Sequence, residues 1–374
     1  MTTRPNADAR DVGRVAAVVA LLLVLLCCQS VGATGPRLLL GVDDDTAKWA
    51  ASPEGVVAVN RDLGIGAMRI MVPWRGQSVP SRTQQIYLHR IALSLTFGQR
   101  VVFALYGRAD DAPVTPGRQK AYYSFATHVM ARIPSLNDIV IWNEVNNPTF
   151  WPRSAGAPAY EALLARCWDA LHSLRSTINV VDSTAPHQDP GSFLEELGAT
   201  YRASHRSRPI LDTFGHNVYP ERSAEVPWAQ HTNGSIDEGD YRTLMSVLGE
   251  AFGGTAQPLP GQGETTIWYL EDGFQTHVPH SKRHLYRGSE TDRHTLSVPD
   301  QAAQLKGAIA LAYCQPNVGA FFNFQLFDDH HLGGWQSGVL WADGTRKASY
   351  AGLREAIAAV QSGSVDCNAF PPQR

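Results

Sequence analysis

Apolar strand-like segments and amphipathic helix-like segments alternate eight times along this chain, which limits its fold more than any other feature. The strand-like segments are short, rich in Val, Ile, Leu and Phe, and mostly apolar without strict alternation, as in a parallel sheet covered on both faces. They lie at 38–42, 67–72, 100–105, 138–142, 179–181, 211–217, 266–270 and 318–324. The helix-like segments carry apolar residues three and four apart and lie at 53–63, 81–95, 118–132, 160–174, 191–204, 239–252, 299–313 and 347–360.

Eight strand–helix units in sequence predict a single-domain (β/α)8 barrel, or TIM barrel, and an open doubly wound sheet is the alternative. No internal repeat and no Pro/Ser/Gly linker marks a second domain in the sequence. We therefore place the barrel at 37–362 and a C-terminal tail at 363–374. Loops that follow the strands form the functional face of such a barrel, and the segments after the fourth, sixth, seventh and eighth strands are long.

Residues 1–33 have the features of a secretory signal peptide. Several arginines form a positive region, the apolar stretch 15–26 follows, and small residues at 31–33 offer a cleavage site. The apolar stretch is shorter than the ~20 residues that span a bilayer, which favours a cleaved signal over an uncleaved anchor. Two adjacent cysteines suggest a lipoprotein, but Leu26 occupies the position where lipoproteins carry a small residue. We expect a secreted, extracellular protein without stable membrane association after cleavage.

The charge composition argues against a nucleic-acid partner. Formal net charge is -3, charged residues make up 18% of the chain, and no basic stripe is visible. Aromatic residues are well represented, with 9 Trp, 12 Tyr and 13 Phe. This balance suits a neutral ligand that is recognised by stacking on aromatic rings.

Three cysteines remain after removal of the signal peptide, which allows at most one internal disulfide. Cys314 ends the seventh predicted helix and Cys367 follows the eighth, so both should lie at the end opposite the functional face. A Cys314–Cys367 disulfide that fixes the tail is one hypothesis, and two free thiols are the other. Cys167, inside the fourth helix, is expected to be a small buried apolar residue.

Two of the predicted strands end in a glutamate that is followed by turn-forming residues. Glu144 ends the fourth strand and Glu271 ends the seventh. These strands face each other across an eight-stranded barrel, so both side chains can point over its axis. Hydrolysis of a glycosidic bond needs one acid that protonates the leaving oxygen and one carboxylate that meets the oxocarbenium-like centre. A solvated turn residue is the alternative for either glutamate alone.

The sequence around these glutamates resembles the clan A retaining glycoside hydrolases, the 4/7 superfamily with cellulase-like and β-xylosidase-like families. Trp142, Asn143 and Glu144 match the family's Asn-Glu pair at the tip of strand four, and Glu271 precedes a turn with Gly273. The strand order extends the resemblance over essentially the whole mature chain, although the specific motifs are local. The resemblance implies that Glu144 is the acid/base, Glu271 is the nucleophile, and Asn143 donates to the sugar 2-hydroxyl.

Further positions carry over from the same resemblance. Arg69 on strand two resembles the family's arginine near the nucleophile, where its charge would keep Glu271 ionised, and a structural ion pair is the alternative. His216 and Tyr219 resemble the His/Tyr pair at the tip of strand six, where the tyrosine hydroxyl can bind the nucleophile. Ordinary loop packing is the alternative for both.

Aromatic residues in the loops of the functional face are expected to stack on sugar rings, or else to plug the space beneath those loops. The candidates are Trp151, Trp228 and Trp335. Three positions depart from the family's pattern. Leu270 precedes the nucleophile, Asp272 places a second acid beside it, and strand eight lacks a tryptophan that Trp335 or Trp341 would replace.

Together these features predict a secreted, monomeric, retaining β-glycosidase. It would hydrolyse O-glycosidic bonds of a β-linked oligo- or polysaccharide by double displacement, through a covalent glycosyl-enzyme. A non-catalytic carbohydrate-binding protein on the same barrel is the alternative. A metal-dependent hydrolase using the run from Asp328 to His331 is a third hypothesis, but this spacing matches no recognised zinc site. We predict no metal and no cofactor, and the sequence leaves the sugar and the mode of attack open.

Overall fold

The computed structural model describes residues 38–290 and 295–371. The compact unit that contains them runs from Leu38 to Arg374. The predicted signal peptide at 1–33 and the last three residues of the predicted tail lie outside the described residues, so both stay predictions. Among the helices described, none is long and apolar enough to cross a membrane.

Eight parallel strands form one sheet in the order β5-β4-β3-β2-β1-β8-β7-β6. The strands are β1 (Leu39–Asp43), β2 (Ala67–Pro73), β3 (Arg100–Tyr106), β4 (Asp138–Ile141), β5 (Asn179–Val181), β6 (Phe214–Asn217), β7 (Ile267–Asp272) and β8 (Val318–Phe324). Parallel bridges between Val181 and Thr213 and between Thr184 and His216 join β5 to β6. These bridges close the sheet into a barrel, so the predicted TIM barrel is confirmed and the open sheet is excluded.

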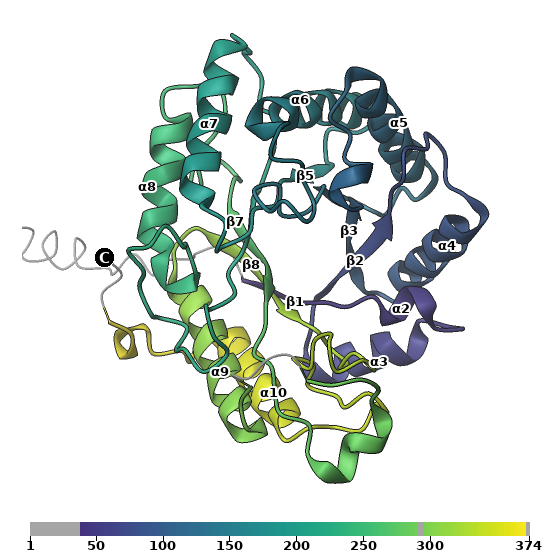
Figure 1. Ribbon diagram of the computed structural model, residues 1–374, viewed down its shortest axis with the longest axis vertical. Coiled ribbons are helices and arrows are strands. Elements are labelled where there is room, and N and C mark those ends of the chain that lie inside the picture. Colours follow the sequence, from purple (N-terminus) through teal and green to yellow (C-terminus); the bar gives the residue numbers. More distant parts are fainter. Residues whose placement is uncertain (1–37, 291–294, 372–374) are drawn as a thin grey trace, which may run out of the picture. The chain divides into compact units, whose positions relative to one another are not determined.

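Helices surround the strands as an outer ring, as Figure 1 shows. They are α2 (Thr46–Trp49), α3 (Glu54–Leu63), α4 (Arg82–Thr96), α5 (Pro116–Arg132), α6 (Gly156–Leu174), α7 (Pro190–Ala203), α8 (Tyr241–Phe252), α9 (Val298–Cys314) and α10 (Ser349–Ser362). Short 3-10 turns are η1 (Ala109–Asp111), η2 (Glu238–Asp240), η3 (His280–Leu285) and η4 (Cys367–Ala369). Side-chain caps define several starts, including a capping box at Ser81 and a hydroxyl cap at Thr115 before Pro116.

Two predicted boundaries differ from the structure for identifiable reasons. The sixth strand begins at Phe214 and not at 211, because Gln257 binds the backbone just before it. The Gln257 side-chain oxygen accepts from Ile210 N at 2.9 Å, and its amide donates to Leu211 O at 3.1 Å. The α8 helix begins at Tyr241 because the preceding residues form the 3-10 turn η2.

The hydrophobic core has two layers. Alternate residues of the strands, such as Val102, Val140 and Trp268, form a small cluster inside the barrel. The intervening residues, such as Ile70 and Ile139, face outward and pack with the helices in a much larger cluster. Strand alternation therefore decides which side chains at the strand tips face the barrel axis.

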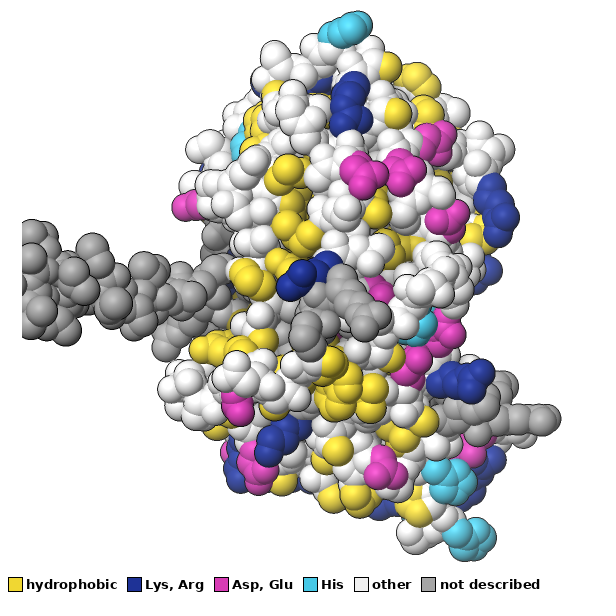
Figure 2. All heavy atoms as spheres, turned by 90° about the vertical axis from the view of Figure 1, so that its left-hand side faces the viewer, with side chains coloured by type: hydrophobic (Ala, Val, Ile, Leu, Met, Phe, Trp, Pro, Cys, Tyr) yellow, Lys and Arg dark blue, Asp and Glu magenta, His cyan; other side chains and the backbone are white. Residues whose placement is uncertain are grey.

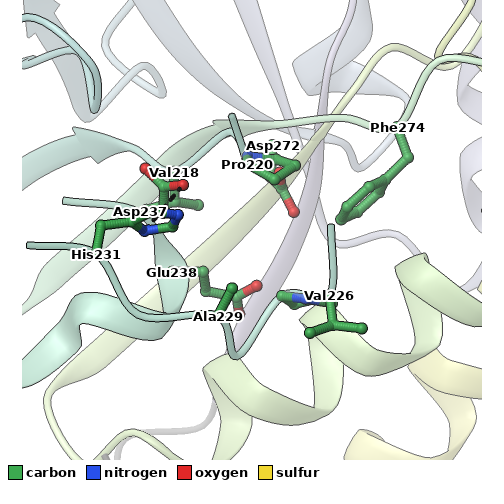
Figure 3. A pocket seen from close by; sticks show the side chains of 10 residues that line it. Val218, Pro220, Val226, Ala229, His231, Asp237, Glu238, Asp272 and Phe274 are labelled. Carbon is green, nitrogen blue, oxygen red and sulfur yellow. Dashed lines mark ion pairs between the residues drawn. The ribbon is translucent and has the colours of Figure 1, made fainter. Parts of the chain in front are cut away.

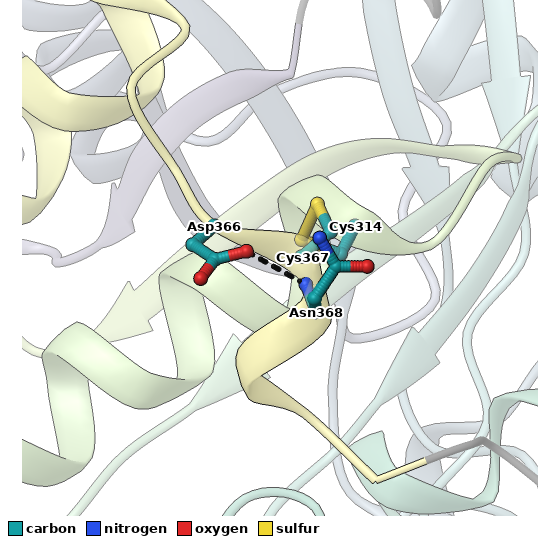
Figure 4. Close-up of a disulfide and its surroundings, with 4 residues drawn as sticks. All are labelled: Cys314, Asp366, Cys367 and Asn368. Carbon is teal, nitrogen blue, oxygen red and sulfur yellow. Dashed lines mark hydrogen bonds between the residues drawn. A yellow bond between two sulfur atoms is a disulfide. The ribbon is translucent and has the colours of Figure 1, made fainter.

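A disulfide joins Cys314 to Cys367, with their Cα atoms 5.4 Å apart. It links the end of α9 to the segment after α10, as Figure 4 shows, and the predicted pairing is confirmed. The Asp366 carboxylate accepts a hydrogen bond from Asn368 N at 3.0 Å and supports the turn. Cys167 is free and fully buried, also as predicted.

Acidic and basic side chains lie interspersed on the face that carries α7 and α8, as Figure 2 shows. This distribution agrees with the small net charge of -3. It gives that face no broad basic surface of the kind that binds the phosphates of nucleic acids.

Candidate active site

The tip of β4 breaks the regular alternation of the strand and turns Glu144 toward the barrel opening. Trp142 and Glu144 have left-handed backbones, with φ of 68° and 40°. Trp142 consequently joins the aromatic cluster of the helix layer, where its indole N–H donates to Phe150 O at 2.7 Å. Asn143 then faces the interior and accepts from Arg69 Nη2 at 2.8 Å. Non-glycine residues in this conformation cost about 1–3 kcal/mol each and cluster at functional sites.

The tip of β7 is irregular as well. Leu270 belongs to the interior cluster, so strict alternation would turn Glu271 outward. The register with β8 shifts between Tyr269 and Asp272, which marks a β-bulge. The bulge turns Glu271 inward, where it meets Arg69. Bulges next to active sites often redirect a side chain in this way.

Glu271 is held by one cation and one hydroxyl. Its Oε1 accepts from Arg69 Nη1 at 2.7 Å, and its Oε2 accepts from the Tyr219 hydroxyl at 2.9 Å. The residue is only 7% exposed. Charge-assisted contacts of this kind favour the ionised form of a carboxyl group.

Arg69 is completely buried and also forms an ion pair with Asp43 at the tip of β1. Burial alone would lower the pKa of Arg69, but Asp43 and Glu271 raise it overall, so the guanidinium stays charged. Burial raises the pKa of Asp43 well above its usual value, the Arg69 charge opposes this, and the Glu271 charge adds to it. One cation thus faces two carboxyl groups.

Glu144 lies among neutral donors. Its Oε1 accepts from Asn217 at 2.8 Å and its Oε2 accepts from Asn147 at 2.7 Å. Its backbone N–H donates to Ser183 Oγ at 3.2 Å. Burial and then the charge of Glu271 raise the pKa of Glu144, while both asparagine hydrogen bonds lower it. The two carboxyl groups therefore differ in environment: a neutral one around Glu144 and a cationic one around Glu271.

Four polar residues of this site were not predicted from the sequence: Asp43, Asn147, Ser183 and Asn217. Two of them could have been recognised from the sequence, because Asp43 ends β1 and Asn217 ends β6. A polar residue at the end of a strand is the same feature that identified the glutamates. Asn147 and Ser183 lie in loops after β4 and β5. Neither has a local pattern that distinguishes it from an ordinary loop residue.

A cleft of about 410 Å³ opens beside Glu144, and its lining includes Asn147, Tyr219, Gly273 and Trp335. Half-buried Trp335 lies against Tyr219, with ring centroids 5.0 Å apart. Its ring also meets Phe324 at the end of β8, with centroids 5.3 Å apart. The loop after β8 thus places an aromatic ring beside Tyr219, which binds Glu271, although β8 itself carries no tryptophan.

A second cleft of about 440 Å³ lies at the tips of β1 and β8, and its lining includes Asp43, Trp49, Tyr106 and Phe324. Both volumes fall in the usual range of ligand sites, about 300–1,000 Å³.

Three other predicted binding residues lie outside the group around the two glutamates. His216 is buried at the β5–β6 seam, where its Nδ1 meets Thr184 Oγ1 and its Nε2 meets Ile236 O, both at 2.7 Å. Trp151 is buried between β4 and α6, and its indole donates to a backbone carbonyl. Trp228 packs on Phe370 of the C-terminal segment, with ring centroids 5.6 Å apart.

The run from Asp328 to His331 gives no metal-ligand cluster among the residues described. Asp328 instead pairs with buried Lys347, whose Nζ lies 2.7 Å from its Oδ1, and accepts from the Tyr286 hydroxyl. Within the described ranges, Glu225, His231 and Asp237 form a group close enough to share an ion.

This chain matches solved structures in its fold. No protein-family model matches the chain. No curated protein matches it by sequence either.

A family 39 glycoside hydrolase from the gut symbiont Bacteroides cellulosilyticus WH2 is 14% identical over 86% of this chain and 64% of its own, with a TM-score of 0.62. The GH5_18 protein from Streptomyces cattleya, in complex with GlcNAc, is 12% identical over 88% of this chain and 82% of its own, with a TM-score of 0.62. The Ignisphaera aggregans GH53 catalytic domain is 16% identical over 86% of this chain and 96% of its own, with a TM-score of 0.59.

These similarities confirm the fold that the sequence resemblance implied. The three matched structures share the (β/α)8 barrel with this chain, at identities of 12–16%. It spans 64% of the family 39 chain and 34% of a β-glucuronidase from Bacteroides uniformis, so some of the matched proteins are much longer. At such identities the likeness concerns the fold, and the activity has to be argued from the site.

Proposed function

We propose that this protein is a secreted retaining β-glycosidase that acts on a β-linked oligo- or polysaccharide. The observation that carries the proposal is the difference between the environments of Glu144 and Glu271. Arg69 and Tyr219 bind Glu271, whereas Glu144 lies among neutral amides and has a raised pKa. Retaining hydrolysis needs this asymmetry, with one carboxyl group protonated and the other ionised at the same pH.

In the first step, Glu271 attacks the anomeric carbon while Glu144 protonates the departing glycosidic oxygen. The carbon–oxygen bond breaks, and the sugar remains attached to Glu271 as a glycosyl-enzyme. In the second step, Glu144, now ionised, removes a proton from water, and the resulting attack on the anomeric carbon frees Glu271. Loss of the Glu271 charge in the intermediate lowers the pKa of Glu144, because that charge helped to raise it.

The surrounding residues have supporting roles in this scheme. Arg69 and Tyr219 orient the nucleophile through its two oxygens. Asn143 accepts from Arg69 through its oxygen, which leaves its amide N–H groups to donate to the sugar 2-hydroxyl. Trp335 offers a flat ring at the edge of the cleft that contains Glu144, where a sugar of the leaving group can stack. The parts of the proposal that concern secretion and a monomeric state rest on the sequence features alone.

The test is the replacement Glu271→Gln, which keeps the size of the side chain and removes the nucleophile. We expect kcat on a responsive aryl β-glycoside to fall by roughly 10³-fold or more, while sugar binding by calorimetry remains. Glu264→Gln, the same change just before β7 at the other end of the barrel, should leave kcat unchanged. NMR of the first-formed product should show the β-anomer.

Three outcomes would overturn the proposal: full activity of Glu271→Gln, an inverted product, or a wild-type protein that binds glycans and hydrolyses no aryl β-glycoside or β-linked polysaccharide. The last outcome would favour the non-catalytic carbohydrate-binding protein.

A further inference from the structure

Two buried carboxyl groups in the layer between barrel and helices take no part in the proposed reaction. Asp272 follows Glu271 on β7, and the bulge that turns Glu271 inward leaves Asp272 on the outer side of the strand. Glu238 lies in η2, the turn before α8. Figure 3 shows the two side chains extending toward one another from these elements.

Neither carboxyl group has a cation or a side-chain donor as its partner among the described residues. Asp272 is 1% exposed and Glu238 is 2% exposed. Within the part of the chain that the structure describes, none of their four oxygens has a hydrogen-bond partner. Buried carboxyl groups are normally paired with a cation or fully hydrogen-bonded, so these two are unexplained by the protein alone.

The two groups line a small cavity. Its volume is about 10 Å³, and its other lining residues include Val218, Val226, Ala229 and Phe274. This is room for about one particle of the size of a water molecule. Apolar side chains form much of the wall, and Asp237 and His231 complete it.

The neighbouring charged residues do not pair with these two carboxyl groups, because they already pair with one another. His231 Nδ1 lies 2.9 Å from Asp240, and its Nε2 lies 3.2 Å from Glu225. Burial alone would lower the pKa of His231, but the Asp240 hydrogen bond and the Asp237 charge raise it to about 9. Its ring is therefore protonated and has no lone pair for a metal. Asp237 pairs with His187, whose Nε2 is 3.1 Å from its Oδ1.

From these observations we infer that the cavity between Asp272 and Glu238 binds one calcium ion, which ties the tip of β7 to the turn before α8. Two unpaired carboxylates balance the charge of one divalent cation. Their four oxygens are hard ligands of the kind that calcium and magnesium prefer. The remaining ligands would have to come from main-chain carbonyls of the lining residues.

Calcium fits the cavity better than magnesium does. Magnesium gives up its water reluctantly and usually keeps several water ligands, whereas this cavity has room for about one particle. The site would hold the strand that carries Glu271 without touching the substrate. The inference does not depend on the proposed glycosidase activity, because its test measures metal content and melting temperature.

The full chain should contain about one calcium per molecule by elemental analysis after dialysis against metal-free buffer. Removal of calcium with EGTA should lower the Tm by about 5 °C or more, and added calcium chloride should restore it. Magnesium chloride at the same concentration should restore much less. A protein without calcium whose Tm responds to neither EGTA nor calcium would overturn the inference in favour of two protonated carboxyl groups or a trapped water.

Matched variants locate the site. Asp272→Asn and Glu238→Gln keep the side-chain shape and remove one charge each, so both should lose the calcium-dependent rise in Tm. In EGTA they should melt no lower than the wild type, because a neutral amide needs no cation. Glu225→Gln, which alters the nearby histidine group, should keep the full calcium response. Retention of that response in both Asp272→Asn and Glu238→Gln would contradict the site, as would its loss in Glu225→Gln alone.

Discussion

At the scale of single residues, Glu144 takes its proposed role from two neutral amides and from its burial beside the charge of Glu271. Asn147 and Asn217 each donate to one of its oxygens. An acid in this role matters most when the leaving group is poor, because a stable leaving anion departs without a proton. We predict that Glu144→Gln lowers kcat by about 10²–10⁴-fold on an alkyl or sugar leaving group.

The same variant should lose much less activity in the glycosylation step when the leaving group is 2,4-dinitrophenolate. The measurement is kcat/KM for a series of aryl glycosides plotted against the pKa of the leaving phenol. A steeper slope for Glu144→Gln than for the wild type supports the acid role. Equal slopes for the two proteins would mean that a group other than Glu144 protonates the leaving oxygen.

The pH dependence of activity can be predicted from the contacts of Glu144. Its pKa is raised by burial and by Glu271, and the Asn147 hydrogen bond opposes that rise. The acid must be protonated, so kcat/KM falls as the pH rises through this pKa. Asn147→Ala should raise the pKa and move the alkaline limb of the profile upward by about one pH unit.

Asn146→Ala is the matched control for this experiment. Asn146 is the adjacent asparagine, but it binds the Ala185 and Gln188 carbonyls of the neighbouring loop and makes no contact with Glu144 among the described hydrogen bonds. The alkaline limb of the kcat/KM profile of Asn146→Ala should lie at the same pH as in the wild type. A downward shift in Asn147→Ala would mean that the asparagine does not stabilise the ionised carboxylate.

The sequence was sufficient to find the two glutamates but not to orient them. Each ends an apolar run, which is a local signal. Their direction depends on the left-handed backbone at Trp142 and on the bulge before Asp272, and both arise from contacts with other strands. For the same reason Trp151 could be placed in a loop of the functional face but not recognised as part of the aromatic cluster around Trp142.

At the scale of elements, local signals predicted every strand and all eight long helices to within a few residues. Apolar runs and caps such as Ser81 depend on neighbours in the sequence, so they can be read directly. The short helix α2 and the turn η2 were missed, because helices of three or four residues are decided by tertiary contacts. Likewise, the start of β6 depends on the distant Gln257.

The C-terminal segment is an element whose position depends on the Cys314–Cys367 disulfide, whose cysteines are 53 positions apart in sequence. Removing it with Cys314→Ser and Cys367→Ser together should lower the free energy of unfolding by about 2–4 kcal/mol, because the unfolded chain gains freedom. The measurement is urea unfolding without reductant. kcat/KM should stay unchanged, since the bond joins the end of α9 to the segment that follows α10, at the end of the barrel opposite the glutamates. An unchanged urea midpoint would contradict the prediction.

At the scale of the whole molecule, closure of the barrel depends on the seam between β5 and β6. The count of strand–helix units predicts that the sheet closes, but not how. Two isolated bridges join these strands, and His216 reinforces them through Thr184 and Ile236. Asp182 adds a hydrogen bond from Gly215 N at 2.6 Å. Backbone hydrogen bonds also cross the seam, such as Asn217 N to Thr184 O at 2.8 Å, so the polar side chains supplement a short backbone ladder there.

His216 should make this closure sensitive to acid. Burial lowers the pKa of His216 to about 4, with a further contribution from His187, although Ile236 and Asp240 oppose it. A lowered histidine pKa means that its contribution to stability is complete above the unfolded pKa of ~6.5 and is lost as the pH falls toward 4. The loss over this window is about 3 kcal/mol.

His216→Phe keeps the ring and removes both nitrogens, which leaves Thr184 and the Ile236 carbonyl without these partners. At pH 7 we expect the variant to be less stable than the wild type by about 2–5 kcal/mol. That difference should shrink steadily as the pH is lowered from 6.5 to 4, because His216 of the unfolded wild type takes up a proton that the buried ring does not accept, and the variant has no such histidine. Asp182, whose pKa burial raises to about 7, has the opposite pH dependence, but it is present in both proteins and cancels in the comparison. Urea unfolding across this pH range gives the measurement, and a constant difference would show that the folded barrel does not lower the pKa of His216.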